Sequence, residues 1–489
     1  MKAKYILLTL LLSMLTVSCD DFLDRQPTNS SNAELAIATT QDAQVAINGI
    51  MRQMSSSNYY GRNFIIYGDA KGGDLTIASQ GRGLDYYYSF NHSATSGSGS
   101  GFWSTGYFII MNINNLISNI NRIMEEGGTG FEPYLGQAYT LRALVYFDLV
   151  RLYGLPYNYN KESYGVPDVT ETLDATAKPT RASVKENYAR ILSDLQAGEE
   201  LLSGSKSKNN GYVNYYVNIA LQARVYLFMD NDEEALTKAQ EIMGSHVYSL
   251  YEPEEWVDSW GAKYGKESIF EIGMDTQSDL GTASLAYYYM AYQKVKNAMG
   301  WFLASDYFLD RLGEDPSDVR WGVMGADEYE STYGTTHNGA CYKYAGGTAL
   351  QGDGGETFTA VNIKVIRLSE IYLIAAEAAL KTSHPDLAAT YLNAIRRRSP
   401  GLAEATESTV SLDMILNERS KEFYGEGLRF FDMIRANQTI VFDDEQNDIP
   451  VTKRAKSIDR TFGKIVLPID QDEINANPAI AGQQNEAYK

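Results

Sequence analysis

The histidines and one glycine-rich stretch are the places where a local catalytic motif would be sought first. The four histidines are His92, His246, His337 and His384. Each stands alone and none belongs to an HExxH pattern, so neither a zinc site nor a nucleophile–base pair can be assembled from local sequence. In the 97–101 stretch, Gly99 occupies the place where a GxSxG motif requires its serine. This stretch is therefore interpreted as a flexible tip.

Acidic residues are abundant, but their spacing does not identify a catalytic pair. Neighbours such as Glu254 and Glu255 are expected by chance among 62 acidic residues. The two acids of a glycosidase can also lie far apart in sequence, so the residues alone leave a secreted glycoside hydrolase open. The Asp230-Asn231-Asp232 cluster lacks the glycine and distal glutamate of an EF-hand loop and is interpreted as a turn. We predict no metal site and no cofactor.

Tyrosine is the residue type that points to binding. The chain has 36 Tyr against 17 Phe, although Phe would serve a core equally well. Tyr is favoured where one ring face packs and the hydroxyl meets water or a ligand. The tyrosines concentrate in two stretches: Tyr59, Tyr60, Tyr67, Tyr86, Tyr87 and Tyr88, then Tyr287, Tyr288, Tyr289 and Tyr292, with Trp301 and Trp321 nearby. The alternative is that these rings only pack the loops against a scaffold and contact no ligand.

The N-terminus indicates export and lipid attachment. Residues 1–18 have a positive start at Lys2 and Lys4, followed by an apolar run too short to span a bilayer. Ser18 and Cys19 then predict cleavage before Cys19 and lipidation of its thiol. Asp20, Asp21 and Asp24 make the start of the mature chain acidic.

Composition limits the class of partner. Apolar residues make up 44% of the chain and charged residues 21%, which is typical of a folded protein. The formal net charge of −20 repels nucleic acid and anionic headgroups. Once Cys19 is lipidated, Cys341 is the one remaining cysteine, so no intramolecular disulfide is expected.

The elements that must position these residues are mostly helices. Apolar residues recur three or four apart, which predicts helices at 33–54, 109–123, 135–150, 183–202, 214–228, 233–243, 364–380, 386–397 and 412–425. Alanine-rich helical pairs of this length are typical of tetratricopeptide-like repeats. Residues 55–106 and 245–361 hold no sustained period and are interpreted as two loop-rich insertions. We predict a fold dominated by helices, a tetratricopeptide-like hairpin scaffold carrying these insertions, with parts at 19–243 and 244–489.

Charged residues in the last helical block predict structure rather than catalysis. Glu418, Arg419, Glu422, Glu426 and Arg429 fall three and four residues apart on one path. Such spacing is typical of an ion network that holds a helix in place. Arg367, Glu370 and Glu377 are interpreted in the same way.

Six stretches, in their order along the chain, resemble motifs of the SusD/RagB family. They are SCDDFLD at 18–24, WSTGYFIIMNINNLI at 103–117, IRLSEIYLIAAEA at 366–378, AIRRR at 394–398, ILNERSKEFYGEGLRFFDMI at 415–434 and LPIDQDEINANP at 467–478. Two departures are Ser420, where a second Arg is usual, and Asp470, where a Pro is usual. The family comprises surface lipoproteins that deliver nutrients to TonB-dependent porins in Bacteroidota.

The resemblance implies a lipid-anchored outer-membrane protein that captures a nutrient without catalysis. The implied partners are a SusC-like TonB-dependent porin and a ligand, most often an oligo- or polysaccharide and in some members a peptide. A helical-repeat scaffold that binds only protein is a third interpretation, but it leaves the two tyrosine-rich insertions unexplained. Tyr and Trp rings would stack on the C–H faces of sugars while polar side chains reach hydroxyls.

We expect the ligand to contact the 69–91 and 287–301 segments, where aromatic residues cluster outside any helical period. Asp69, Asp74 and Arg82 are the candidates for hydroxyl contacts. The candidate ring platforms are Tyr86, Tyr88, Tyr288, Tyr292 and Trp301.

Overall fold

The computed structural model describes residues 37–81, 84–95, 101–174, 176–208, 211–275, 277–291, 298–327, 337–345, 359–446 and 448–489. The predicted signal at 1–18, the lipidation residue Cys19, and the candidate site residues Arg82 and Tyr292 lie outside these ranges. Within them, no helix is long and apolar enough to cross a membrane.

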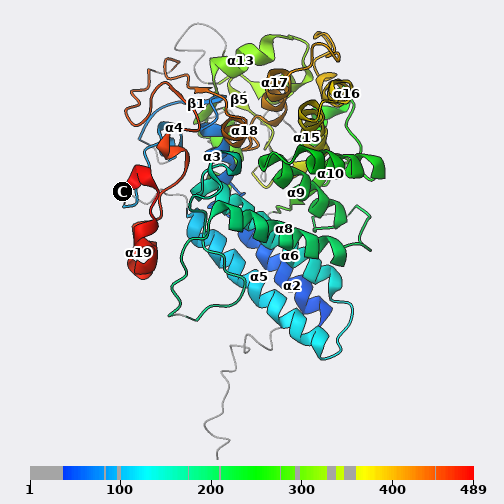
Figure 1. The fold of residues 1–489 in the computed structure, drawn as a ribbon. Coiled ribbons are helices and arrows are strands. Elements are labelled where there is room, and N and C mark those ends of the chain that lie inside the picture. The colour runs from blue at the N-terminus through cyan, green and yellow to red at the C-terminus, as the bar shows by residue number, and fades with distance from the viewer. Residues whose placement is uncertain are drawn as a thin grey trace, which may run out of the picture.

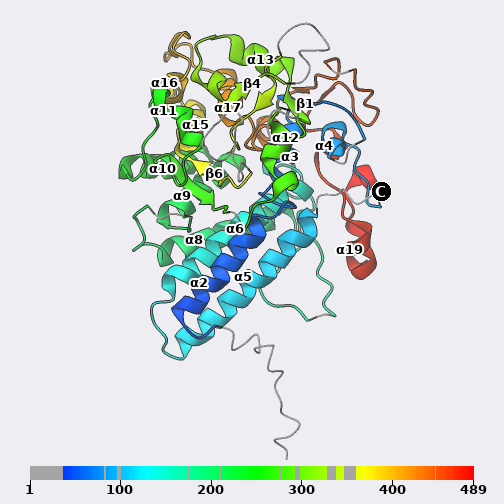
Figure 2. The same cartoon turned by 180° about the vertical axis from the view of Figure 1, so that it is seen from behind.

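Helical hairpins form the scaffold, as predicted (Figure 1). Four long helices lie roughly side by side in the front view (Figure 1) and the back view (Figure 2): α2 (Thr40–Met54), α5 (Phe102–Glu125), α6 (Glu132–Tyr153) and α8 (Val184–Leu201). The scaffold continues through α9 (Tyr215–Phe228), α10 (Asp232–Ser245), α15 (Leu368–Lys381), α16 (Pro385–Arg396), α17 (Leu412–Phe423) and α18 (Arg429–Arg435). The tetratricopeptide-like helical scaffold is therefore confirmed.

Local sequence accounts for several helix ends and close approaches. Thr39 with Asp42, and Ser183 with Glu186, form capping boxes that satisfy backbone N–H groups at the starts of α2 and α8. Between α9 and α10, small side chains allow close packing. Ala220, Ala223, Ala235 and Ala239 are all fully buried.

The two predicted insertions contain short elements rather than continuous loops. The first holds α3 (Asn63–Ala70), β1 (Leu75–Ile77) and α4 (Asp85–Ser89). The second holds α11 (Pro253–Trp256), β2 (Ser268–Ile272), α12 (Leu285–Tyr289), β3 (Phe302–Ala304), α13 (Asp306–Gly313), β4 (Met324–Gly325) and β5 (Ala340–Cys341). All eight residues of α3 are buried, so its sequence shows no amphipathic period.

Antiparallel strand pairs join the two insertions through β1 and β3, and join the second insertion to the scaffold through β2 and β6 (Ile363–Arg367). In the described ranges β1 pairs with β3, β2 with β6, β4 with β5, and β7 (Ile440–Val441) with β8 (Ser457–Ile458). The β6 strand corrects the prediction of a helix from residue 364. Its five residues are buried and pair with β2, and the helix starts only at Leu368.

One large buried core joins residues from both sides of the predicted boundary at 243/244. A smaller cluster lies among α15, α16 and α17 and includes Leu373, Leu392 and Ile415. The boundary itself stays a prediction.

A buried ion network holds the C-terminal helices, as predicted. Arg367, at the end of β6, donates to Glu422 at 2.8 Å and to Glu426 at 2.9 Å, and also bonds Glu267 at 3.1 Å. Arg398, just after α16, bonds Glu422 and Glu267 as well. The network therefore ties β2, β6, α16 and α17 together. Further pairs are Arg224–Glu370, Arg419–Asp432 and Arg435–Glu377.

Candidate functional site

The two tyrosine-rich stretches, far apart in sequence, meet in space. Strands β1 and β3 pair with Leu75 opposite Ala304 and Ile77 opposite Phe302. The pairing continues beyond the strands, because the backbone N–H of Ala78 donates to the carbonyl of Trp301 at 2.8 Å. The predicted 69–91 and 287–301 segments are thus held together by main-chain hydrogen bonds.

Four partly exposed side chains gather where these segments meet, and we call them the ring cluster: Arg62, Tyr86, Tyr287 and Tyr288. The Arg62 Cζ lies 5.2 Å from the centroid of the Tyr288 ring, and its guanidinium donates to the Tyr288 hydroxyl at 3.5 Å. Tyr287 meets Tyr288 edge to face, with ring centroids 5.5 Å apart. Tyr86 lies close enough to Arg62 and Tyr288 for both to influence its pKa.

Buried aromatic residues support the ring cluster on the side that faces the protein interior. The Trp301 ring is stacked near Tyr288, with centroids 6.4 Å apart and planes inclined by 21°. The Trp301 indole N–H donates to the Ser79 carbonyl at 2.9 Å, which ties this ring to the first insertion. Tyr86 packs against Tyr87 at 4.6 Å, and Tyr87 is fully buried. The exposed ring faces therefore rest on a rigid base.

The electrostatics of the ring cluster suit a polar ligand with apolar faces. Burial raises the pKa of Tyr86 to about 12, although a hydrogen bond with Tyr87 and the nearby Arg62 charge act in the opposite direction. The Tyr86 hydroxyl therefore stays protonated at neutral pH and can both donate and accept hydrogen bonds. Ring faces offer stacking and Arg62 offers charge-assisted donors.

Asp69 and Asp74 have structural roles, which corrects the expectation that they reach ligand hydroxyls. Both carboxylates are buried, with 3% and 4% of their residue surface exposed. Asp69 accepts from the Tyr289 hydroxyl at 2.7 Å and from the Gly427 N–H at 2.9 Å. Asp74 is paired with Arg311 at 2.9 Å and with Arg429 at 3.1 Å.

Two of the predicted platforms are also buried. Trp301 is 2% exposed, so it supports Tyr288 instead of offering a free face. Tyr88 is fully buried and donates to Asp444 at 2.8 Å, with Arg454 stacked over its ring. Tyr86 and Tyr288 are the described candidates whose rings stay partly exposed.

Sequence reasoning missed Arg62 and did not select Tyr287. Arg62 precedes α3 and follows Tyr59, Tyr60 and Gly61, so a cation two positions after a tyrosine pair was the available signal. Its partner Tyr288 is 226 residues away, and local sequence cannot show that contact.

The carboxyl of Asp69 makes a testable contribution to pH dependence. Burial raises the pKa of Asp69 to about 8, against the opposing hydrogen bonds from Tyr289 and Gly427. An unfolded Asp titrates near pH ~4, so the stability that protonated Asp69 contributes is present below about pH 4 and is lost as the pH rises toward about 8. Asn at this position keeps a neutral side chain that can accept from Gly427 and donate to Tyr289.

We therefore expect Asp69→Asn to lose less stability than the wild type between pH 5 and pH 8. Urea unfolding at several pH values measures this difference. Asp310→Asn, an exposed carboxyl on α13, serves as the control and should follow the wild-type curve. Parallel curves for Asp69→Asn and the wild type would contradict the prediction.

Comparison with known proteins gives matches over nearly the whole chain. A model of the SusD family matches residues 196–488, and a model described as "Starch-binding associating with outer membrane" matches residues 21–227. Among curated proteins, the SusD-like protein P2 of Formosa agariphila is 27% identical over 476 residues, covering 88% of this chain and 90% of the relative.

Solved structures resemble the fold closely. A SusD superfamily protein from Bacteroides thetaiotaomicron is 33% identical, with a TM-score of 0.81, over 92% of this chain and 100% of that one. A putative sugar binding protein from Bacteroides vulgatus is 32% identical, with a TM-score of 0.82, over 93% and 100%. The surface glycan-binding protein A of B. thetaiotaomicron, solved with laminarihexaose, is 20% identical over 92% and 100% and shares the fold, with a TM-score of 0.69.

Proposed function

This chain belongs to the SusD/RagB family, and from that membership we propose that it is an outer-membrane lipoprotein that binds a glycan at the ring cluster and passes it, without catalysis, to a TonB-dependent transporter. The family description that matches residues 21–227 supports starch-type ligands and outer-membrane association. The printed names of two similar structures, a putative sugar binding protein and a glycan-binding protein with laminarihexaose, support the same ligand class.

The observation that carries the ligand class is the ring cluster. Two partly exposed Tyr rings, Tyr86 and Tyr288, lie beside the Arg62 guanidinium on a rigid aromatic base. Each ring contact contributes roughly 0.5–1.5 kcal/mol beyond area burial, so two rings with a few hydrogen bonds give affinity in roughly the micromolar range. Such affinity permits release to a transporter.

The absence of catalysis is proposed from the family and from the structural roles of Asp69 and Asp74. Asp69 and Asp74 lie in the first insertion, but hydrogen bonds and ion pairs hold them in the interior. Neither is placed beside the exposed rings as a general acid. The transporter partner is proposed from family membership alone.

Screening the protein without residues 1–19 on a glycan array tests the function. We expect selected neutral glycans to bind and mass spectrometry to find them intact after prolonged incubation. Glycan shortening that a single Asp or Glu substitution abolishes would make the protein a hydrolase. Binding of peptides and of no glycan would favour the peptide-binding alternative.

Changing Tyr288 and Tyr86 to Ala tests where the glycan binds. Each substitution is expected to cost about 1–3 kcal/mol of binding free energy, because a ring platform is lost. Isothermal calorimetry with an array-selected glycan measures the loss, and thermal melting should change little. Tyr391→Ala on α16, where Tyr391 forms a partly exposed edge-to-face pair with Tyr372, is the matched control and should keep full affinity. Full affinity in Tyr86→Ala and Tyr288→Ala would remove the ring cluster from the site.

Cys19 is expected to carry the lipid that holds the protein at the outer membrane. Labelled palmitate should enter the wild type and not Cys19→Ala, because the Cys19 thiol is the group to which the lipid is attached. Equal labelling of both proteins, or recovery of the wild type as a soluble periplasmic protein, would contradict this.

Extraction in mild detergent and pull-down should also recover a large β-barrel partner, and recovery of the lipoprotein alone would count against the transporter.

A further inference from the structure

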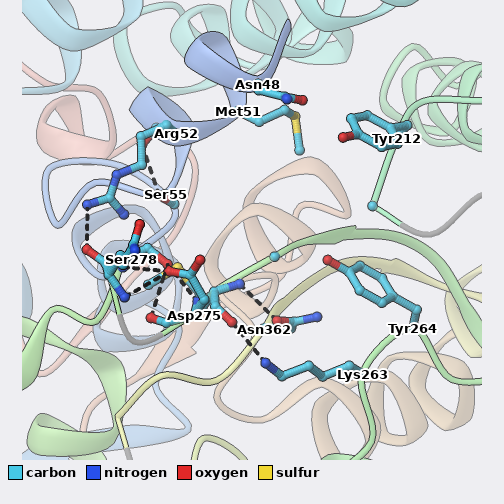
Figure 3. A pocket seen from close by; sticks show the side chains of 14 residues that line it. Asn48, Met51, Arg52, Ser55, Tyr212, Lys263, Tyr264, Asp275, Ser278 and Asn362 are labelled. Atoms are coloured by element: carbon cyan, nitrogen blue, oxygen red, sulfur yellow. Dashed lines mark hydrogen bonds between the residues drawn. The ribbon is translucent and has the colours of Figure 1, made fainter. Parts of the chain in front are cut away.

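A cavity of about 700 Å³ lies at the C-terminal end of α2, and we call it the α2 cavity (Figure 3). Its volume is in the range of small-ligand sites. One side comes from α2, and the others come from residues 211–212, the chain on both sides of β2, and Asn362. The side chains used below are Arg52, Tyr212, Lys263, Tyr264, Asp275 and Asn362.

The Tyr264 ring is held in place by its neighbours. A Cβ on Gly211 would lie 3.0 Å from the ring, and a Cβ on Gly273 would lie 2.4 Å from the hydroxyl, so the Tyr264 side chain packs closely against both glycines. Tyr264 itself has a φ of 53°, a left-handed conformation that is costly for a residue other than glycine. Lys208 secures this backbone by donating to the Tyr264 carbonyl at 2.7 Å. The ring is therefore a preorganised wall.

The polar side chains of the cavity are oriented by the backbone after β2. Asn362 accepts from the Met274 N–H at 2.8 Å, and its amide nitrogen faces the Tyr264 hydroxyl (Figure 3). One oxygen of Asp275 accepts from the Ser278 N–H at 2.8 Å and from the Gln277 N–H at 3.0 Å. Together, the amide, hydroxyl and carboxylate groups form a surface suited to a polyhydroxylated ligand.

Two cations flank that surface. Lys263 donates to the Met274 carbonyl at 3.1 Å, and Arg52 donates to the Gln277 carbonyl at 3.3 Å. Their other N–H groups have no hydrogen-bond partner among the residues that the structure describes. A guanidinium has five N–H donors and an ammonium three, so most of both remain for a ligand. Hydrogen bonds within its own turn lower the pKa of Asp275, and the nearby Arg52 charge helps to lower it. The cavity lining thus carries two cations and one carboxylate, Asp275, in a chain of net charge −20.

We propose that the α2 cavity is a second carbohydrate site, separate from the ring cluster, that takes an acidic sugar unit such as a uronate or a sulfated residue. The proposal rests on the glycan-binding function proposed above. Tyr212 and Tyr264 provide ring faces for the sugar, Asn362 and Asp275 contact its hydroxyls, and Lys263 with Arg52 pairs with its anionic group.

Calorimetry with trigalacturonic acid and its uncharged methyl ester tests the charge requirement, with a chondroitin sulfate disaccharide as the sulfated probe. The wild type should bind at least one of the acidic probes. If that probe is trigalacturonic acid, the methyl ester should bind about tenfold more weakly or not at all. The affinity should fall as salt rises, because partly exposed charges are screened. No binding of either acidic probe, or equal affinity for the acid and its ester, would overturn the proposal.

Variants locate the acidic probe and separate this proposal from the ring cluster. Lys263→Met and Arg52→Met should each weaken the affinity for the acidic probe about tenfold without lowering the melting temperature, since both side chains are exposed. Lys185→Met, an exposed lysine on α8, is the control and should keep wild-type affinity. Tyr288→Ala should also keep it. If Tyr288→Ala loses affinity for the acidic probe while Lys263→Met keeps it, the proposal for the α2 cavity is overturned. If neutral glycans do not bind while binding of the acidic probe depends on Lys263, only the proposal for the ring cluster is overturned.

Discussion

Glu422→Gln is expected to lower the free energy of unfolding by about 3–5 kcal/mol, because it removes one partner from a buried ion network. Glu422 is fully buried and bonds Arg367 at 2.8 Å and Arg398, with Arg320 at 3.6 Å. Although burial opposes ionisation, Arg398, Arg367 and Arg320 hold the pKa of Glu422 well below its usual range. A neutral Gln would leave those guanidinium groups buried with too little compensating charge.

Urea unfolding at neutral pH measures this loss, and Glu407→Gln is the matched control. Glu407 is exposed in the loop between α16 and α17, so its substitution should change stability by no more than about 0.5 kcal/mol. A loss in Glu422→Gln as small as the control's would mean that the network does not hold the C-terminal helices.

Gly427→Ala is expected to destabilise the fold by about 2–5 kcal/mol, through strain and overpacking together. Gly427 has a φ of 77°, and an added Cβ would lie 2.7 Å from the Cα of Ile65 in α3. The contacted atom is backbone and cannot move aside alone. A Cβ added at Gly68, on the same helix, would also clash with the Gly427 carbonyl. The two glycines thus let α3 and the 425–428 turn touch directly.

Gly244→Ala on α10 is the control for this substitution. An added Cβ there meets no atom within 4 Å, and the position is helical. Alanine should therefore be neutral or stabilising by about 0.5–1 kcal/mol. If Gly427→Ala unfolds at the wild-type denaturant concentration, the close approach of α3 and the turn is not as described.

Several scaffold helices, such as α2 and α5, could be predicted from sequence because they are amphipathic. In α5, the residues Ile109, Ile113, Leu116 and Ile120 repeat at helical spacing and are buried. Sequence periodicity missed two elements for the opposite reason. Helix α3 and strand β6 are buried on every side, so neither presents the one-sided pattern that periodicity detects.

The candidate site was predictable only in part, because its decisive contacts are long-range. The tyrosine clusters pointed to the 69–91 and 287–301 segments, and β1 and β3 bring these segments together. The roles of Asp69 and Asp74 depend on partners more than two hundred residues away, Tyr289 for one and Arg311 for the other. No local pattern distinguishes a carboxylate that meets a ligand from one that meets such a partner.

A crystal structure of the protein with an array-selected neutral glycan tests the central claim most directly, because it locates the ligand and shows whether it is intact. We predict an uncut oligosaccharide with sugar rings stacked on Tyr86 and Tyr288 and an oxygen within hydrogen-bond distance of Arg62. A glycan bound elsewhere with the ring cluster empty, or a shortened glycan in the site, would contradict the account.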